Sequence, residues 1–118
     1  MSKSRCITTP IYYVNERPHI GHVYTTTLCD AWARAMRLSG DEVFFLTGTD
    51  EHGVKVEQSA RDKGLDPQAL ADLNSAEFRK AMELFDLTND EFIRTTDPDH
   101  IRQVQLFVKK LMDRGDIY

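Results

Sequence analysis

The sequence predicts an α/β fold with a parallel sheet. Residues 6–9, 43–46 and 92–95 form three short apolar or β-branched segments, which is typical of strands. The longer stretches between them carry apolar residues three and four positions apart, which is typical of amphipathic helices. Since strands that alternate with helices form βαβ units, we expect three parallel strands joined by crossover helices.

The first strand and the first helix are the best delimited of these elements. The strand over 6–9 ends before Pro10, and residues 11–17 have the composition of a loop. Pro18 suits a first helical turn, where its missing N–H would have no partner anyway. The helix that follows ends near Gly40, at the position of a C-terminal cap. Its predicted apolar face consists of Leu28, Ala31, Trp32, Ala35 and Leu38.

The second strand, over 43–46, is a continuous apolar run, which is typical of a strand covered on both faces. A polar loop over 48–53 leads to a helix over about 54–63 that Gly64 ends. Asp66 and Pro67 then supply an N-cap and a first-turn proline for another helix. The apolar face predicted for that helix consists of Leu70, Leu73, Ala81 and Phe85, with Phe78 and Met82 beside it.

The third strand, over 92–95, leads to a helix that opens at Asp97 and Pro98 and ends near Gly115. One side of this helix carries Ile101, Val104, Val108 and Leu111.

Length and composition restrict the function classes. A chain of 118 residues with 41% hydrophobic residues is enough for one domain core. A net charge of −4 argues against a dedicated nucleic-acid binder. No apolar run reaches the roughly 20 residues of a membrane span, so no membrane partner is expected. Cys6 and Cys29 form no CxxC pair, which fits a reducing compartment. We therefore predict a cytoplasmic protein, with an organelle as the alternative.

Two histidines, His19 and His22, lie where the first loop enters the first helix. Three positions apart in a first helical turn, they point to the same side, where free N–H groups and the helix dipole favour an anion. Gly21 between them lets a flat ligand approach the backbone. The pattern predicts a nucleotide site. It leaves open a helix cap beside a surface histidine, and also a zinc site, for which no third ligand is near in sequence.

The polar loop over 48–53 is the second cluster of residues that could bind a ligand or take part in catalysis. Ligands of parallel α/β sheets bind outside the carboxyl ends of the strands, so this loop and the histidine loop should face one crevice. Asp50 is a natural partner for a ligand ammonium group. Glu51 and His52 could equally be loop residues that keep the surface polar, and His52 could cap the next helix.

Around these clusters the sequence closely resembles the start of the methionyl-tRNA synthetases, class I aminoacyl-tRNA synthetases with the His-Ile-Gly-His signature. The resemblance covers essentially the whole chain in order. It rests on residues 8–15, 18–22, 24–26, 45–53, 55 and 92–97. It implies a Rossmann-like sheet: the first half of a class I synthetase nucleotide-binding domain, with three strands and crossover helices.

The resemblance also implies a ligase reaction. Full-length members activate L-methionine with ATP and Mg²⁺ to methionyl-adenylate, and then transfer the methionyl group to tRNA(Met). The reaction needs positioning and charge stabilisation and no protein nucleophile. By the same resemblance, His19 and His22 are the catalytic residues at the phosphates, and Gly21 and Asn15 complete the ATP site.

The methionine pocket follows from the resemblance in the same way. It assigns Ile11 and Tyr13 to the lining of the pocket and Asp50 to the α-amino group of methionine. Glu51, His52 and Lys55 are assigned as site-adjacent only, and no residue is assigned to a metal.

Several parts of the family pattern do not occur in this sequence. These are the Lys-Met-Ser-Lys-Ser loop, the cysteines of the zinc site and the helical anticodon-binding domain. We therefore expect residues 1–118 to be the N-terminal half of the catalytic domain, truncated before the zinc-knuckle insertion, with tRNA(Met) bound through absent domains. Alone, the chain should be inactive, and its first strand, left at an edge, should favour self-association. The alternatives are an HxGH nucleotidylyltransferase and a non-catalytic domain that keeps the fold.

Overall fold

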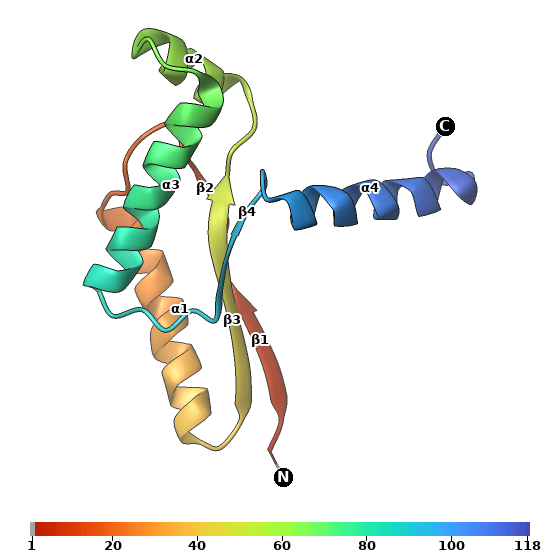
Figure 1. The fold of residues 1–118 in the computed structure, drawn as a ribbon. Helices are drawn as coiled ribbons and strands as arrows, with labels where there is room; N and C mark the ends of the chain where they lie inside the picture. Colours follow the sequence, from red (N-terminus) through yellow and green to blue (C-terminus); the bar gives the residue numbers. More distant parts are fainter. Residues whose placement is uncertain (1) are drawn as a thin grey trace.

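A computed structural model describes residues 2–118, with strands and helices in the order β1-β2-α1-β3-α2-α3-β4-α4 (Figure 1). The strands are β1 (Ser4–Thr8), β2 (Tyr12–Tyr13), β3 (Glu42–Asp50) and β4 (Glu91–Arg94). The helices are α1 (Ile20–Leu38), α2 (Val54–Asp62), α3 (Pro67–Leu84) and α4 (Pro98–Asp113). The predicted α/β class is confirmed.

β3 is the centre of the sheet and runs parallel to each strand that pairs with it. β1 pairs with residues 42–46 of β3, β4 with residues 46–49, and β2 with residues 49–50. β2 lies in the segment that the sequence predicted as a loop, so that prediction was wrong for Tyr12 and Tyr13.

β3 is also longer than predicted and includes the first part of the polar loop over 48–53. Gly48 explains the extension, because a Cβ at this position would overlap the carbonyl oxygen and Cγ2 of Ile93. Only glycine allows β4 to approach β3 this closely, and β4 then carries the sheet pairing to Thr49.

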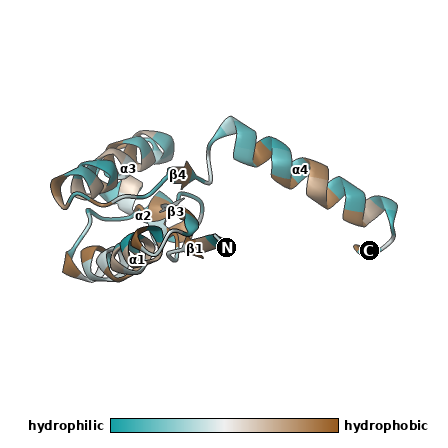
Figure 2. Ribbon diagram, turned by 90° about the horizontal axis from the view of Figure 1, so that it is seen from below, coloured by the Kyte–Doolittle hydropathy of each residue, from teal (hydrophilic) through white to brown (hydrophobic). Residues whose placement is uncertain are grey.

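Helices α1 and α3 cover the same face of the sheet (Figures 1 and 2). Side chains alternate along a strand, and Phe45, Thr47 and Thr49 on one face of β3 are all buried. Phe44, on the opposite face, is 49% exposed. The prediction that this strand is covered on both faces was therefore wrong for the part of the chain that the structure describes.

The core consists of two clusters of buried side chains. The first joins the residue after β2 to α2 and α3, and the second joins β2 and β4 to α3. One contains Val14, Val56, Ala60, Leu70 and Ala71, and the other contains Tyr12, Phe78, Met82 and Phe92.

The buried side of α1 is not the face that its apolar spacing predicted. Leu28 is 55% and Leu38 90% exposed, whereas Thr26, Asp30 and Ala33 are buried. Asp30 explains the rotation, because its carboxylate accepts hydrogen bonds from the backbone N–H and the hydroxyl of Thr88, at 2.7 and 2.6 Å. Polar contacts with the segment before β4 thus decide which side of α1 faces inward.

The predicted faces of α3 and α4 are corrected in a similar way. In α3, Leu70, Phe78 and Met82 are buried as predicted, but Leu73 is 51% and Phe85 50% exposed. The inward side of α3 includes the polar residues Asn74 and Ser75 in their place. α4 projects away from the sheet (Figure 2), and none of its residues is buried.

None of the described helices is both long enough and apolar enough to cross a lipid bilayer.

Candidate functional site

The two histidines build the N-terminal cap of α1. His19 is the N-cap residue, and its Nδ1 accepts a hydrogen bond from the backbone N–H of Gly21 at 3.1 Å. His22 Nδ1 accepts in return from the backbone N–H of His19, also at 3.1 Å. The two rings stack with their centroids 3.8 Å apart. The helix cap that the sequence left open is therefore real, and it uses both histidines. We call His19 and His22 the histidine cap.

This cap fixes where each imidazole carries its proton. A ring nitrogen that accepts a hydrogen bond cannot also be protonated, so Nδ1 of both His19 and His22 is the acceptor. In the neutral ring the proton then sits on Nε2. The histidine cap therefore presents two neutral Nε2–H donors at the positive end of a helix dipole, which is an arrangement suited to phosphate oxygens.

Gly21 is explained by the same geometry. A Cβ at this position would lie 3.0 Å from Cε1 and 3.1 Å from Nδ1 of the His19 ring, tighter than normal van der Waals contact. Glycine thus gives the His19 imidazole room to fold back over its own backbone. This reason is independent of any ligand.

His22 is packed more deeply than His19. Its ring meets Tyr12 edge-on at a centroid distance of 4.7 Å and Phe78 at 5.0 Å. Burial, and then the neighbouring His19, lower the pKa of His22 below its ordinary value. His22 is therefore held as a neutral imidazole at pH 7. Sequence patterns did not predict Tyr12 or Phe78 as neighbours of this residue, because both pairings depend on the sheet and on α3.

A cavity of about 240 Å³ opens beside the histidine cap. Five of the predicted site residues line it: Ile11, Tyr13, Asn15, His19 and His22. Tyr12 and Glu16 complete the lining. Residues of the predicted nucleotide site and of the predicted methionine pocket thus share one cavity.

Asp50 lies next to this cavity, at the end of β3. It pairs in register with Tyr13, whose ring lies 5.9 Å from the Lys55 Nζ. Asp50 itself lines a separate cavity of about 300 Å³, together with His52 and the first turn of α4. The two loops predicted to face one crevice therefore line two different cavities in the described residues.

Glu51 was predicted to be site-adjacent, but its carboxylate is taken up within the fold. Its side chain is fully buried, and Arg94 binds it through Nε at 2.7 Å and Nη2 at 2.8 Å. The hydroxyls of Thr96 and Thr49 donate to it at 2.5 and 2.7 Å. Burial raises the pKa of Glu51, but these hydrogen bonds outweigh it and hold the pKa below its usual value. We call this group the Glu51 clamp.

The Glu51 clamp joins the carboxyl ends of β3 and β4. The Glu51 backbone N–H donates to the Thr95 hydroxyl at 2.9 Å, and Arg94 also reaches Asp72 of α3 at 2.5 Å. The clamp therefore positions the residue before it, Asp50. No sequence signal separated Glu51 from its polar neighbours, because Arg94 lies 43 positions away.

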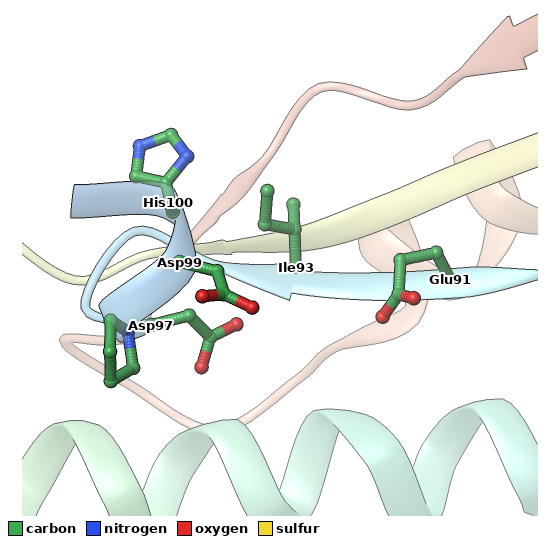
Figure 3. Close-up of a pocket in the computed structure, with 6 residues that line it drawn as sticks. Glu91, Ile93, Asp97, Asp99 and His100 are labelled. Atoms are coloured by element: carbon green, nitrogen blue, oxygen red, sulfur yellow. The ribbon is translucent and has the colours of Figure 1, made fainter. Parts of the chain in front are cut away.

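A larger cavity, of about 420 Å³, lies away from the histidine cap, between β4 and the start of α4 (Figure 3). Its lining includes the side chains of Glu91, Asp97, Asp99 and His100. Asp97 accepts the backbone N–H of Arg94 at 2.9 Å, as part of the turn before α4. Within residues 2–118, no three His, Cys, Asp or Glu side chains are grouped so as to hold a metal ion. We assign no chemistry to this cavity.

Comparisons with known proteins show the family of the chain. A family model described as tRNA synthetases class I (M) matches residues 5–118. Among curated relatives, the methionine–tRNA ligase of Rickettsia bellii is 56% identical over 118 residues, which is 100% of this chain and 23% of that protein. The methionine–tRNA ligase of Mesorhizobium japonicum is 55% identical over 112 residues, which is 95% of this chain and 22% of that protein.

The solved structures that resemble this chain belong to the same family. A methionyl-tRNA synthetase of Mycobacterium tuberculosis, in complex with methionyl-adenylate, superimposes with a TM-score of 0.94 at 45% sequence identity. The match covers 98% of this chain and 23% of that one. The chain thus spans about 23% of the length of these relatives.

Proposed function

The chain belongs to the tRNA synthetases class I (M), and from this premise we propose that it carries part of the methionine-activating site of a methionine–tRNA ligase. In the proposed reaction, a methionine carboxylate oxygen attacks the α-phosphorus of ATP. A new O–P bond forms and the bond to pyrophosphate breaks. The observation that carries the proposal is the histidine cap, because its two Nε2–H donors are fixed at a helix N-terminus.

The proposed role of His19 and His22 is to stabilise charge on the phosphates. Negative charge builds up on the phosphate oxygens as pyrophosphate leaves, and donors that are already oriented stabilise it without reorganisation. A neutral imidazole suits this role, since each ring gives a defined N–H direction. Gly21 and Asn15 are proposed to complete the ATP site, and Mg²⁺ would arrive with ATP as part of the substrate.

The proposed methionine pocket consists of Ile11, Tyr13 and Asp50. Ile11 and Tyr13 are 43% and 52% exposed, so both offer apolar surface to a thioether side chain. The Asp50 carboxylate, paired in register with Tyr13, would bind the α-amino group. Lys55 and His52 stay site-adjacent in this proposal, and Glu51 is assigned to the clamp that positions Asp50.

Later steps are part of the same proposal. The methionyl group would pass from the adenylate to tRNA(Met), and the tRNA would be bound mainly by protein segments other than this one. Both cysteines, Cys6 and Cys29, are free thiols in the described residues, which is compatible with a reducing compartment such as the cytoplasm. That the isolated chain is inactive, or that it associates through β1, stays a prediction.

A chimera tests the proposal directly. This chain replaces the matching 118-residue segment of the Rickettsia bellii methionine–tRNA ligase, and methionine-dependent ATP–pyrophosphate exchange is measured. We expect exchange within about tenfold of the parent enzyme, which corresponds to about 1.4 kcal/mol of activation free energy. A folded chimera without exchange would refute the proposal and favour a non-catalytic domain that has kept the fold.

His19→Ser supplies the matched variant within the chimera. Serine is a good N-cap residue, so the helix end should be kept while the imidazole donor is lost. We expect a fall in exchange of about 100-fold or more, as for the loss of one preorganised donor to a charged intermediate. Unchanged exchange would remove His19 from the chemistry.

A further inference from the structure

Tyr12, like Glu16, lines the cavity without having been predicted as a site residue. It belongs to β2, pairs in register with Thr49 of β3 and is only 7% exposed. Its ring meets the His22 imidazole edge-on at 4.7 Å and stacks on Phe78 of α3 at 5.6 Å. Since Phe78 also meets His22 at 5.0 Å, the imidazole lies against two aromatic rings from two different elements.

The Tyr12 hydroxyl reaches the backbone of the same histidine. The Thr26 hydroxyl donates to the carbonyl oxygen of His22 at 2.9 Å, one helical turn earlier. When Thr26 gives its single hydroxyl proton to this carbonyl, Tyr12 is the donor of the 2.9 Å bond between the two hydroxyls, and the Tyr12 hydroxyl itself lies 3.5 Å from the same carbonyl oxygen. Tyr12 O–H therefore donates to Thr26, which donates to His22. Tyr12 therefore contacts the imidazole ring of His22 directly and binds the His22 main chain through Thr26.

We propose that Tyr12 is a positioning residue for His22, which keeps the imidazole in the orientation and tautomer that present Nε2–H to a phosphate. The inference rests on the proposed function of the histidine cap. The His22 ring must stay in place for its Nδ1 to accept the His19 backbone N–H. If it rotates away, it loses its contacts with the Tyr12 and Phe78 rings together, so these rings select the capping rotamer.

Burial of the His22 ring favours the same neutral state. The titratable groups near it are His19 on its own helix, the buried Tyr12 of β2, and Tyr13 and Glu16 across the cavity. α3 contributes the uncharged ring of Phe78. Tyr12 keeps water from one side of the imidazole, and this burial disfavours the charged form of the ring. Loss of the Tyr12 ring should therefore expose His22 and make it easier to protonate.

The buried cluster itself offers a matched control. Phe92 belongs to the same cluster as Tyr12, but its ring stacks under the Arg79 guanidinium at 4.3 Å and not on His22. Phe92→Leu removes a ring of similar size from the same core. A purely structural role of Tyr12 would therefore be reproduced by Phe92→Leu, whereas a positioning role would not.

The first experiment observes His22 without any substrate. Proton–nitrogen NMR spectra of the histidine rings, recorded against pH in this chain, report the tautomer and the pKa of each ring. In Tyr12→Leu we expect the pKa of His22 to rise and its single Nε2–H tautomer to become a mixture. Tyr12→Phe, which keeps the ring, should retain both properties. If Tyr12→Leu does not fold, Tyr12→Met replaces it under the same criteria.

The outcome is decided by comparison with the control. If the His22 signals of Tyr12→Leu match those of Phe92→Leu in tautomer and pKa, the positioning role is refuted. If His22 changes in Tyr12→Leu alone and recovers in Tyr12→Phe, the role is supported.

The second experiment separates this inference from the proposed function. In the ligase chimera, Tyr12→Leu should lower exchange by roughly 10- to 100-fold, because a displaced catalytic donor costs that much. The acid limb of its pH profile should move to higher pH, whereas that of Phe92→Leu should not. An inactive parent chimera would refute the proposed function, and the NMR result would still decide the role of Tyr12. An active chimera whose Tyr12→Leu profile does not move would refute the positioning role alone.

Discussion

The histidine cap and the Glu51 clamp lie at the same end of the sheet but are built from different interactions. The cap bonds join residues two and three positions apart, at an exposed helix end. The clamp bonds join a fully buried carboxylate to residues 43 and 45 positions away. The cap bonds leave the Nε2–H groups free to bind a ligand, and the clamp bonds stabilise the ends of the sheet strands. Loss of the cap should therefore affect function most, and loss of the clamp should affect stability most.

The largest loss of unfolding free energy is expected from Glu51→Ala. This change leaves the Arg94 guanidinium without its main partner, beside the unpaired hydroxyls of Thr96 and Thr49. Breaking a buried ion pair by removing one partner costs about 3–5 kcal/mol of unfolding free energy. Urea unfolding followed by circular dichroism measures this loss. Glu57→Ala on α2, at an exposed carboxylate, is the control, and equal losses in the two variants would contradict the clamp.

The next largest difference in stability is expected between alanine substitutions at two glycines, Gly48 and Gly21. Gly48→Ala forces a Cβ into the Ile93 backbone of β4, and overpacking of this kind costs about 1–3 kcal/mol or more. Gly21→Ala meets only the His19 side chain, and alanine is favoured over glycine in helices by about 1 kcal/mol. We expect Gly48→Ala to lower the urea midpoint clearly and Gly21→Ala to change it little. The reverse order would show that the cap, and not the pairing of β3 with β4, limits stability.

The smallest effect concerns the pH dependence of stability. The pKa of His22 is lower in the folded chain than its ordinary value of 6.5, so the unfolded chain binds more protons between the two values. The free energy of unfolding should therefore begin to fall as the pH drops through 6.5, and level off below the folded pKa. Urea unfolding of the wild type and His22→Gln, compared over roughly pH 5–8, isolates this contribution. A difference between the two that does not vary with pH would contradict the neutral, packed imidazole.

Most helix ends were predictable because their signals are local, although the start of α1 was not: Pro18 was predicted in its first turn, whereas the helix begins at Ile20 with His19 as the N-cap. Asp66 accepts hydrogen bonds from the N–H groups of Gln68 and Ala69 before a first-turn Pro67, as predicted for α3. Gly40 and Gly115 follow α1 and α4 with positive φ angles of 88° and 77°. Each of these features depends on a few neighbouring residues, so composition and spacing are enough to find it.

The site was predictable only in part, for the same reason. His19 and His22 could be grouped from their spacing, and Ile11, Tyr13 and Asn15 were assigned through the family resemblance; these five residues do share a cavity. Glu51 could not be separated from Asp50 by sequence, since its role depends on Arg94 in another strand. Tyr12 was hidden in a segment with loop composition, and only its pairing with β3 makes it a strand residue.

The sequence by itself thus determined the alternation of strands and helices, the helix caps and the histidine pair, because each depends on contacts within about one helical turn. Tertiary structure decided which face of α1 is buried, how far β3 extends and what surrounds His22. Apolar spacing favoured the side with Leu28 and Leu38, yet the carboxylate of Asp30 faces inward to bind Thr88. A buried carboxylate must find its hydrogen-bond donors, and these lie 58 positions away, beyond the reach of any local pattern.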